Sequence, residues 1–312
     1  MIDAVIFSGG GARGIFQVGA YLALKANQGF HPTVFGGSSV GALNASLFAC
    51  GKDSIAAQAW TNIQDNPTLY FPSDFLNNEN NLIVSANGFT RIIKHLLTRQ
   101  KINGLVDPAI KSILEQISVK DLITSDDTVN TLILNWTSLR TGLSISASAR
   151  DFPTDEDFRK AIIASASFPG IFPTIDHVKT YGGLSTFCLD AGIREVTTLC
   201  PVIKSVKEDP EVRITIINCN VNNPLPSTEI YNSIEKNILR SIDIARHTIF
   251  KQEISLFKER NLIGPPHYRR FSYRIIEPDP AEVTGVMDFS KKSLLRLYQH
   301  GKEQALTANW VD

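Results

Sequence analysis

The sequence predicts an α/β fold with a mainly parallel sheet, and its first fifty residues carry most of that prediction. Short apolar runs at residues 4–7 and 33–36 are each closed by glycines, as expected of strands that are buried on both faces. A helix-like stretch follows each run, at residues 14–28 and 40–50. Because strands that alternate with helices form parallel sheets, these four segments predict two neighbouring strand–helix units.

The run of residues 26–51 supports the same fold, because it contains no Lys, Arg, Asp or Glu. A membrane span is the alternative for such a run. It also contains His31, Pro32 and several Asn and Gly residues, which disfavour a helix embedded in lipid. The interior of a buried sheet therefore explains the run better.

The later elements follow from apolar periodicity and turn residues. Residues 60–90 are rich in Asn, Pro and Ser and predict surface loops. The apolar stripe at 89–97 predicts a helix docked on the sheet, with a membrane-surface helix as the alternative. A hairpin is predicted around residues 140–142. The remaining predicted elements are a long helix with a stripe of Ile234, Ile238, Ile242, Ala245 and Ile249, a strand at 270–276, and a helix at 290–308 capped by Ser290.

The composition limits the possible partners. The chain has 312 residues, 43% of them apolar, which suffices for one large α/β domain or two modest ones. Lys and Arg number 31, as do Asp and Glu, and this balance argues against a nucleic-acid partner. The four cysteines have no pair spacing and predict buried free thiols without a metal site. The first residues lack the features of a cleavable signal peptide, so we expect a cytoplasmic protein without a transmembrane helix.

A glycine loop lies between the first predicted strand and its helix. Gly9, Gly11 and Gly14 match the pattern G-x-G-x-x-G of dinucleotide-binding folds. That function also needs an acidic residue after the second strand, and none lies between Ala4 and Lys52. The P-loop pattern G-x-x-x-x-G-K-[ST] is absent as well. Binding of NAD, FAD or a nucleotide phosphate is therefore disfavoured.

The same loop suits another anion. Backbone N–H groups at a helix N-terminus lack helical partners and can stabilise the oxyanion of acyl transfer. Arg13 could strengthen this field or hold the loop in place. A tight turn without a ligand is the alternative, but one glycine would suffice for that.

Ser39 is the candidate nucleophile. It is central in the G-x-S-x-G pattern of Gly37 and Gly41, between the second predicted strand and its helix. Ser38 is a competitor outside the central position. The α/β-hydrolase form of this motif would need more strands before the serine and a late histidine in a loop. His177 and His267 are loop residues that keep a Ser-His-Asp triad open, whereas the helical patterns around His95, His247 and His300 favour structural roles.

Asp190 is the candidate base. It ends the apolar run of "FCLDAGI" and precedes Gly192. A free Asp has a pKa of about 3.9, so it needs burial or a hydrogen bond with the serine to act near neutral pH. An Asp in an ordinary turn is the alternative. Other acids nearby are Asp151, Asp155, Asp157 and Asp176.

Taken in order, these motifs resemble the patatin-like phospholipase family. "GGGARG" is similar to its oxyanion-loop motif, "GGSSVGALNAS" to its nucleophile elbow, and "LDAG" to its D-G-[AG] motif. The segments "ASASFPGIFP", "NGLVDPAIKSILEQ", "WTSLRTG" and "MDFSKKSLLRLYQHGKEQA" resemble the family too. The core similarity covers residues 3–204. Ala191 is a departure, because family members usually have glycine directly after the Asp.

The resemblance implies a three-layer sandwich, with a mainly parallel central sheet flanked by helices. It implies a single domain over residues 1–312, completed by residues 205–312. Ser39 would be the nucleophile and Asp190 the sole base of a Ser-Asp dyad, without metal or cofactor. The implied oxyanion residues are Gly10, Gly11 and Arg13, and the motif glycines are Gly9, Gly14, Gly37, Gly41 and Gly192.

The implied reaction is hydrolysis of carboxylic esters of phospholipids through an acyl-serine intermediate. The substrate would be a membrane or micellar lipid, reached through peripheral membrane contact. Basic residues could support that contact or form an ordinary solvated face, namely Lys258, Arg260, Arg269, Arg270 and Arg274. A conventional Ser-His-Asp esterase and an inert lipid-binding or scaffold protein remain the alternative functions.

Overall fold

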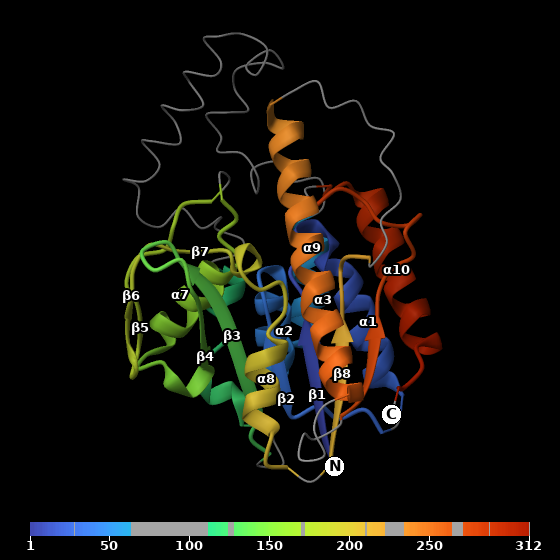
Figure 1. Ribbon diagram of the computed structural model, residues 1–312, viewed down its shortest axis with the longest axis horizontal. Helices are drawn as coiled ribbons and strands as arrows, with labels where there is room; N and C mark the ends of the chain where they lie inside the picture. Colours follow the sequence, from blue (N-terminus) through green and yellow to red (C-terminus); the bar gives the residue numbers. More distant parts are fainter. Residues whose placement is uncertain are drawn as a thin grey trace.

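The computed structural model describes residues 1–27, 29–63, 112–123, 128–169, 172–209, 211–221, 234–263, 271–286 and 288–311. In these ranges a central sheet lies between two layers of helices (Figure 1). The predicted three-layer α/β sandwich is confirmed.

The central sheet is mostly parallel. Its strands follow the order β4-β3-β2-β1-β8-β9, and β7 pairs with the outer part of β3. Strands β3, β2, β1, β8 and β9 run parallel, whereas β4 and β7 are antiparallel to β3. Their bounds are β1 Ile2–Phe7, β2 Val34–Gly37, β3 Thr131–Ser138, β4 Ser144–Ser148, β7 Cys188–Leu189, β8 Val212–Ile217 and β9 Ser272–Ile276. A separate hairpin joins β5 (Val178–Thr180) to β6 (Gly183–Ser185).

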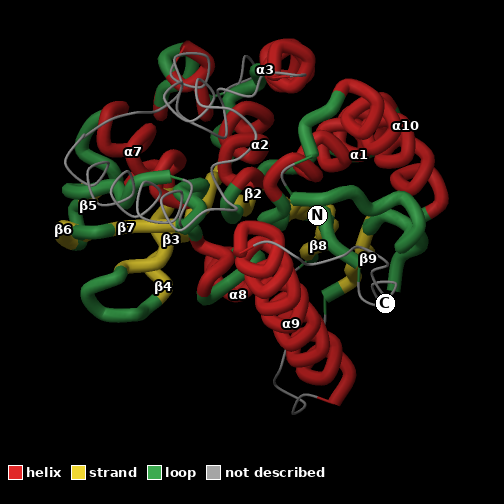
Figure 2. The backbone as a smooth tube through the Cα atoms, turned by 90° about the horizontal axis from the view of Figure 1, so that it is seen from above, coloured by secondary structure: helices red, strands yellow, loops and turns green. Residues whose placement is uncertain are grey.

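Helices cover both faces of the sheet (Figure 2). One face carries α1 (Gly14–Ala26), α2 (Val40–Ala49), α3 (Asp53–Ile63), α7 (Asp155–Ser165) and α10 (Lys291–Thr307). The other carries α8 (Leu199–Val206) and α9 (Ile234–Ile263). Alternation along β1 feeds both cores, because Val5 and Phe7 pack into the first and Ala4 and Ile6 into the second. A strand buried on both faces has to be apolar throughout, as the sequence pattern predicted.

Several predicted elements are confirmed with shifts of one or two residues. They are the first two strand–helix units, the hairpin of β3 and β4, the strand β9 and the last helix α10. Ser290 occupies the N-cap of α10, but its side chain makes no capping hydrogen bond. Residues 60–63 belong to α3, so the predicted loop is wrong there. The rest of that loop and the predicted helix at 89–97 lie outside the described residues.

The long helix α9 is confirmed, but the described part of its predicted apolar stripe is only partly buried. Ala245 is exposed, whereas Ile249 is half-buried and packs against the core. The fully buried side chains lie one residue further along, and they are Arg246, Phe250, Ile254, Phe257 and Asn261. Polar residues stand at both ends of this buried face, so apolar periodicity alone does not locate it.

Strand β8 was not predicted from the sequence. Arg213 and Thr215 interrupt its apolar pattern. In the structure Arg213 lies beside Asp3 of β1, with its Nε 2.8 Å from the Asp3 carboxylate. The charged Arg213, which breaks the apolar pattern of the strand, is therefore paired with a carboxylate of the neighbouring strand.

Of the four free cysteines, Cys50, Cys188 and Cys219 are buried, as predicted, and Cys200 is exposed, which the sequence did not indicate. Burial raises the pKa of each buried thiol to about 12. These three side chains are therefore unreactive thiols near neutral pH.

The parallel register brings three strand ends together. Phe7 of β1 pairs with Gly37 of β2 on one side and with Ile217 of β8 on the other. The glycine loop follows β1, Ser39 follows β2, and Asn218 follows β8. Because parallel strands end at the same edge, this edge collects the polar groups of the site.

Candidate active site

Ser39 lies on a tight turn between β2 and α2. Its φ of 55° and ψ of −130° fall in a region that side-chain-bearing residues rarely adopt. The backbone packed around this turn leaves no room for a side chain on either glycine of the motif. A Cβ on Gly41 would lie 2.3 Å from the carbonyl oxygen of Phe7, and one on Gly37 would lie 2.4 Å from that of Gly41. Both glycines of the motif are thus required by close backbone approach.

The structure brings Ser39 and Asp190 together. The Ser39 Oγ donates a hydrogen bond of 2.5 Å to Oδ2 of Asp190. The other carboxylate oxygen, Oδ1, accepts the N–H of Gly192 at 2.8 Å. Both side chains are buried, at 4% and 1% exposure. Ala191 lies in a short 3₁₀ helix (Ala191–Ile193) without positive φ, so its Cβ is accommodated.

The end of α7 and the residues directly after it hold both Ser39 and Asp190. The N–H of Ser39 donates to Oγ of buried Ser165, at 2.9 Å. The N–H of Asp190 donates to the carbonyl oxygen of Ser167, at 3.0 Å. These residues belong to "ASASFP", part of a segment that resembles the family. Through the hydroxyl of Ser165 and the carbonyl oxygen of Ser167, this stretch supports both reacting groups.

The glycine loop presents unused N–H groups. Gly9 donates to the carbonyl oxygen of Val196, at 2.9 Å, and Ala12 donates to that of Val286. Within the described residues, the N–H groups of Gly10 and Gly11 donate to no acceptor, and the same is true of Val40 directly after Ser39. Gly11 has a φ of 58°, which glycine adopts without strain. Three free donors therefore stand on the segments that flank Ser39.

Arg13 is turned towards structural partners. Its Nε donates to the carbonyl oxygen of Thr284 at 2.7 Å, and its Nη1 contacts Asn220 and Asp243, each at 3.0 Å. Asn220 in turn donates to the carbonyl oxygen of Gly9. Of the two sequence-based interpretations of Arg13, this geometry favours the one in which it holds the loop.

The asparagines after β8 were missed by sequence reasoning. Asn218 accepts the hydroxyl of Ser8, and Asn220 links Gly9 to Arg13. Polar residues directly after a buried parallel strand would have indicated them. Recognising that pattern required strand β8, which was not predicted.

The histidine alternative gains no geometric support. His177 is exposed, has a φ of 59° and pairs with Asp176. His267 lies outside the described residues. His300 accepts the N–H of Asp279 on the far side of α1. In the described part of the chain, no group of three or more His, Cys, Asp or Glu side chains could hold a metal ion.

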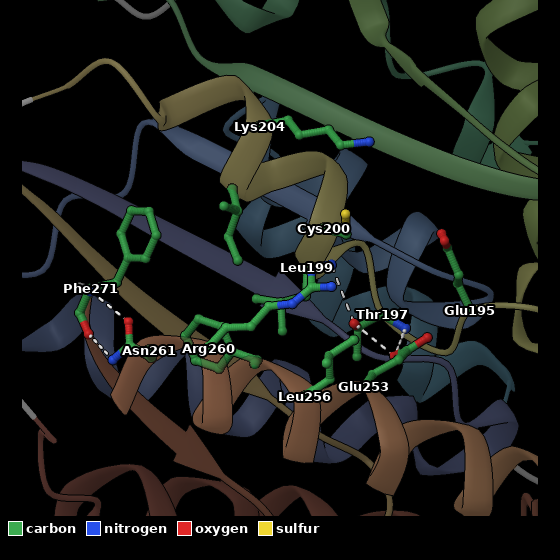
Figure 3. Close-up of a pocket in the computed structure, with 12 residues that line it drawn as sticks. Glu195, Thr197, Leu199, Cys200, Lys204, Glu253, Leu256, Arg260, Asn261 and Phe271 are labelled. Atoms are coloured by element: carbon green, nitrogen blue, oxygen red, sulfur yellow. Dashed lines mark hydrogen bonds between the residues drawn. The ribbon is translucent and has the colours of Figure 1, made fainter. Parts of the chain in front are cut away.

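A separate pocket of about 390 Å³ lies between α8 and α9 (Figure 3). Ser39 and Asp190 do not line it. Glu253 on its wall accepts the N–H groups of Val196 and Thr197, at 2.9 and 3.1 Å. Burial raises the pKa of Glu253 to about 8, against the opposing effect of these hydrogen bonds. Through Glu253, α9 fastens the segment that follows Asp190.

Comparisons with known proteins identify a family and a fold. A family model described as patatin-like phospholipase matches residues 5–199. No curated protein matches the chain. The crystal structure of VipD from Legionella pneumophila is similar over 100% of this chain and 68% of its own, with 14% identity and a TM-score of 0.50, a likeness of fold. ExoU, crystallised in complex with SpcU from the type III secretion system of Pseudomonas aeruginosa, is 15% identical over 100% of this chain and 54% of its own, with a TM-score of 0.38.

None of the described helices is both long and apolar enough to cross a bilayer.

Proposed function

Because the chain belongs to the patatin-like phospholipase family, we propose that it hydrolyses carboxylic esters of phospholipids, with Ser39 as nucleophile and Asp190 as base. One observation carries the proposal. The Ser39 hydroxyl donates a hydrogen bond of 2.5 Å to the Asp190 carboxylate, on a strained turn at the carboxyl edge of a mostly parallel sheet.

The chemistry needs two proton transfers through one carboxylate. As Ser39 Oγ attacks the ester carbonyl carbon, Asp190 takes the hydroxyl proton, and it then gives that proton to the leaving alcohol. The product of this half is an acyl-serine. In the second half Asp190 takes a proton from water, the water oxygen attacks the acyl carbon, and Ser39 regains its proton as the fatty acid leaves.

The negative charge on the carbonyl oxygen needs donors that are already in place. The free N–H groups of Gly10 and Gly11, with that of Val40, supply them. Removing one donor of this kind from an enzyme costs about 3 kcal/mol of transition-state stabilisation. Arg13 contributes by holding the loop, since its own donors are occupied.

Two alternative functions are less well supported. A Ser-His-Asp esterase needs a histidine at the serine, and the described partner of Ser39 Oγ is a carboxylate. An inert lipid-binding protein would not need a strained serine beside free N–H donors, because strain of this kind persists only where the fold enforces it.

Substitution of the two reacting groups tests the proposal. We expect Ser39→Ala and Asp190→Asn each to lower phospholipid hydrolysis more than about 1,000-fold while the protein stays folded. The matched control is Ser38→Ala, since the Ser38 hydroxyl donates to the carbonyl oxygen of Glu195 and not to Asp190. Turnover retained by either variant rejects the dyad. A fluorophosphonate probe that labels Ser38→Ala but not Ser39→Ala identifies the nucleophile directly.

We also propose that the protein reaches its substrate at a membrane or micellar surface, through peripheral contact. Sedimentation with anionic phospholipid vesicles tests this part separately from catalysis. Protein that stays in the supernatant at low salt contradicts it.

A further inference from the structure

Helix α9 buries an arginine beside the reacting groups. Arg246 is 3% exposed, and both of its terminal nitrogens, Nη1 and Nη2, lack a hydrogen-bond partner in the described part of the chain. Buried guanidinium groups are normally paired, because removing a cation from water without compensation is costly. Two unused donors on one buried cation therefore indicate a missing anion.

The guanidinium of Arg246 lies directly against two glycines, Gly9 and Gly192. A Cβ on Gly9 would lie 2.3 Å from Nη2 of Arg246 and 3.0 Å from Cβ of Ser39. A Cβ on Gly192 would lie 2.8 Å from Nε of Arg246 and 2.9 Å from Oδ1 of Asp190. The guanidinium is thus next to both reacting side chains. Its place also explains why glycine is needed at these two positions.

The Asp190 carboxylate lies close to this cation, but no carboxylate of the described residues forms an ion pair with it. The ring of Phe168 lies 5.7 Å from the guanidinium carbon, which supplies only a cation–π contact. Asp190 is bonded to Ser39 and Gly192. Asp243, one helical turn before Arg246, is occupied by Arg13 and Arg240. No carboxylate of the described residues is thus left to pair with Arg246, so an anion brought by the substrate can take this place.

We propose that Arg246 binds the phosphate group of a glycerophospholipid and so selects acyl esters that carry an anionic group next to the scissile bond. This inference rests on the proposed function. The carbonyl oxygen already has the N–H donors of Gly10 and Gly11, so the guanidinium is left for a second anion. Its planar fork suits two phosphate oxygens at once. In a glycerophospholipid the phosphate is attached to the glycerol carbon next to the one that carries the sn-2 acyl group, which places it within reach of a cation beside Ser39.

Relative rates on two lipids test the proposal. The substrates are a short-chain phosphatidylglycerol and a diacylglycerol with the same acyl chains, both in neutral detergent micelles. We expect Arg246→Gln to lower kcat/KM about 100-fold for the phospholipid and less than 5-fold for the diacylglycerol. Arg246→Lys keeps the charge without the fork, so it should recover part of the loss. The control is Lys251→Gln at an exposed position of the same helix, which should leave both rates unchanged.

Equal losses on both lipids overturn the proposal, because Arg246 would then serve the oxyanion or the fold. The absence of any loss in Arg246→Gln overturns it as well.

A binding measurement keeps the inference testable if the proposed hydrolysis fails. The probes are a diether phosphatidylglycerol and the matching diether glycerol, which have no ester to cleave, titrated calorimetrically as micelles. We expect the wild-type protein to bind the phospholipid ether more tightly, and Arg246→Gln to lose that preference. Equal preference in both proteins rejects the phosphate site, whether or not the protein is a hydrolase. Loss of the preference without any hydrolysis by the wild type rejects the proposed reaction and retains the phosphate site.

Discussion

The two sides of the glycine loop differ in how their polar groups are used. On the paired side, formed by Arg13, Asn220 and Thr284, the donors of Arg13 meet acceptors. On the open side, formed by the N–H groups of Gly10 and Gly11 and the guanidinium of Arg246, the donors face no described acceptor. This difference separates the donors that hold the loop from the donors that remain available to a ligand. Preorganised donors of the second kind stabilise charge that develops during a reaction.

The largest expected effect comes from breaking the paired side. Arg13→Ala removes the hydrogen-bond donor of Oδ1 of Asn220 and of Oδ1 of Asp243. We expect the free energy of unfolding to fall by about 3 kcal/mol, as for other broken buried ion pairs, when measured by urea denaturation. Arg240→Ala is the matched control, because Arg240 pairs with the same Asp243 from a more exposed position, and it should cost less than about 1 kcal/mol. Equal effects of the two variants would mean that the loop is held in another way.

The next effect depends on pH and on Glu253. Val196 accepts the N–H of Gly9 and donates its own N–H to Glu253, so this carboxyl group supports the paired side. Burial raises the pKa of Glu253 from 4.5 to about 8. Between these two pH values the folded protein keeps a proton on Glu253 that the unfolded chain releases. Stability should therefore fall as pH rises from about 5 to about 7, by up to about 1.4 kcal/mol per pH unit. Glu253→Gln should remove this component. Unfolding curves of the two proteins that run parallel across this range would contradict the expected titration.

A smaller effect is expected from Ser165, which accepts the N–H of Ser39. Ser165→Ala removes the acceptor of the buried Ser39 N–H. An unsatisfied buried donor costs about 1–3 kcal/mol, and a less firmly held Ser39 should lower kcat about 10-fold. Ser167→Ala serves as the control, since the Ser167 hydroxyl bonds to the carbonyl oxygen of Ile163 in the same segment. If both variants have the same kcat, Ser165 does not position the nucleophile.

The smallest effect on stability is expected from Arg246 itself. Removing a cation that lacks hydrogen bonds should change the free energy of unfolding by less than about 1 kcal/mol, with stabilisation as the expected sign. Thermal unfolding of Arg246→Gln beside Arg13→Ala measures the contrast between the two sides directly. A loss in Arg246→Gln as large as that in Arg13→Ala would place Arg246 among the groups that hold the fold.

Local patterns sufficed to predict the elements next to Ser39. The strands β1 and β2, the glycines around them and the helices that follow are defined by neighbouring residues, so a short stretch of sequence contains the whole signal. The meeting of Ser39 with Asp190 was predicted from the order of three motifs and a family resemblance. Periodicity alone does not bring together residues 151 positions apart.

Other parts of the site could not be predicted because their meaning lies in distant partners. Arg213 conceals β8 in the sequence, since its charge is balanced only by Asp3 across the sheet. Arg246 resembles any other basic residue on a long helix, and its burial becomes evident only when α9 packs beside Gly9 and Gly192. Asn218 and Asn220 gain a function only once β8 lies beside β1.

The pairing of β1 with β8 also bears on synthesis at the ribosome. The two strands join residues such as Asp3 and Arg213, which are 210 positions apart. During translation the nascent chain already contains both reacting groups while one edge of its first strand still lacks a neighbour. Such late, long-range pairing slows folding and exposes an aggregation-prone edge in the meantime. It also delays completion of the sheet edge that holds Ser39 and Asp190 until the residues of β8 have emerged.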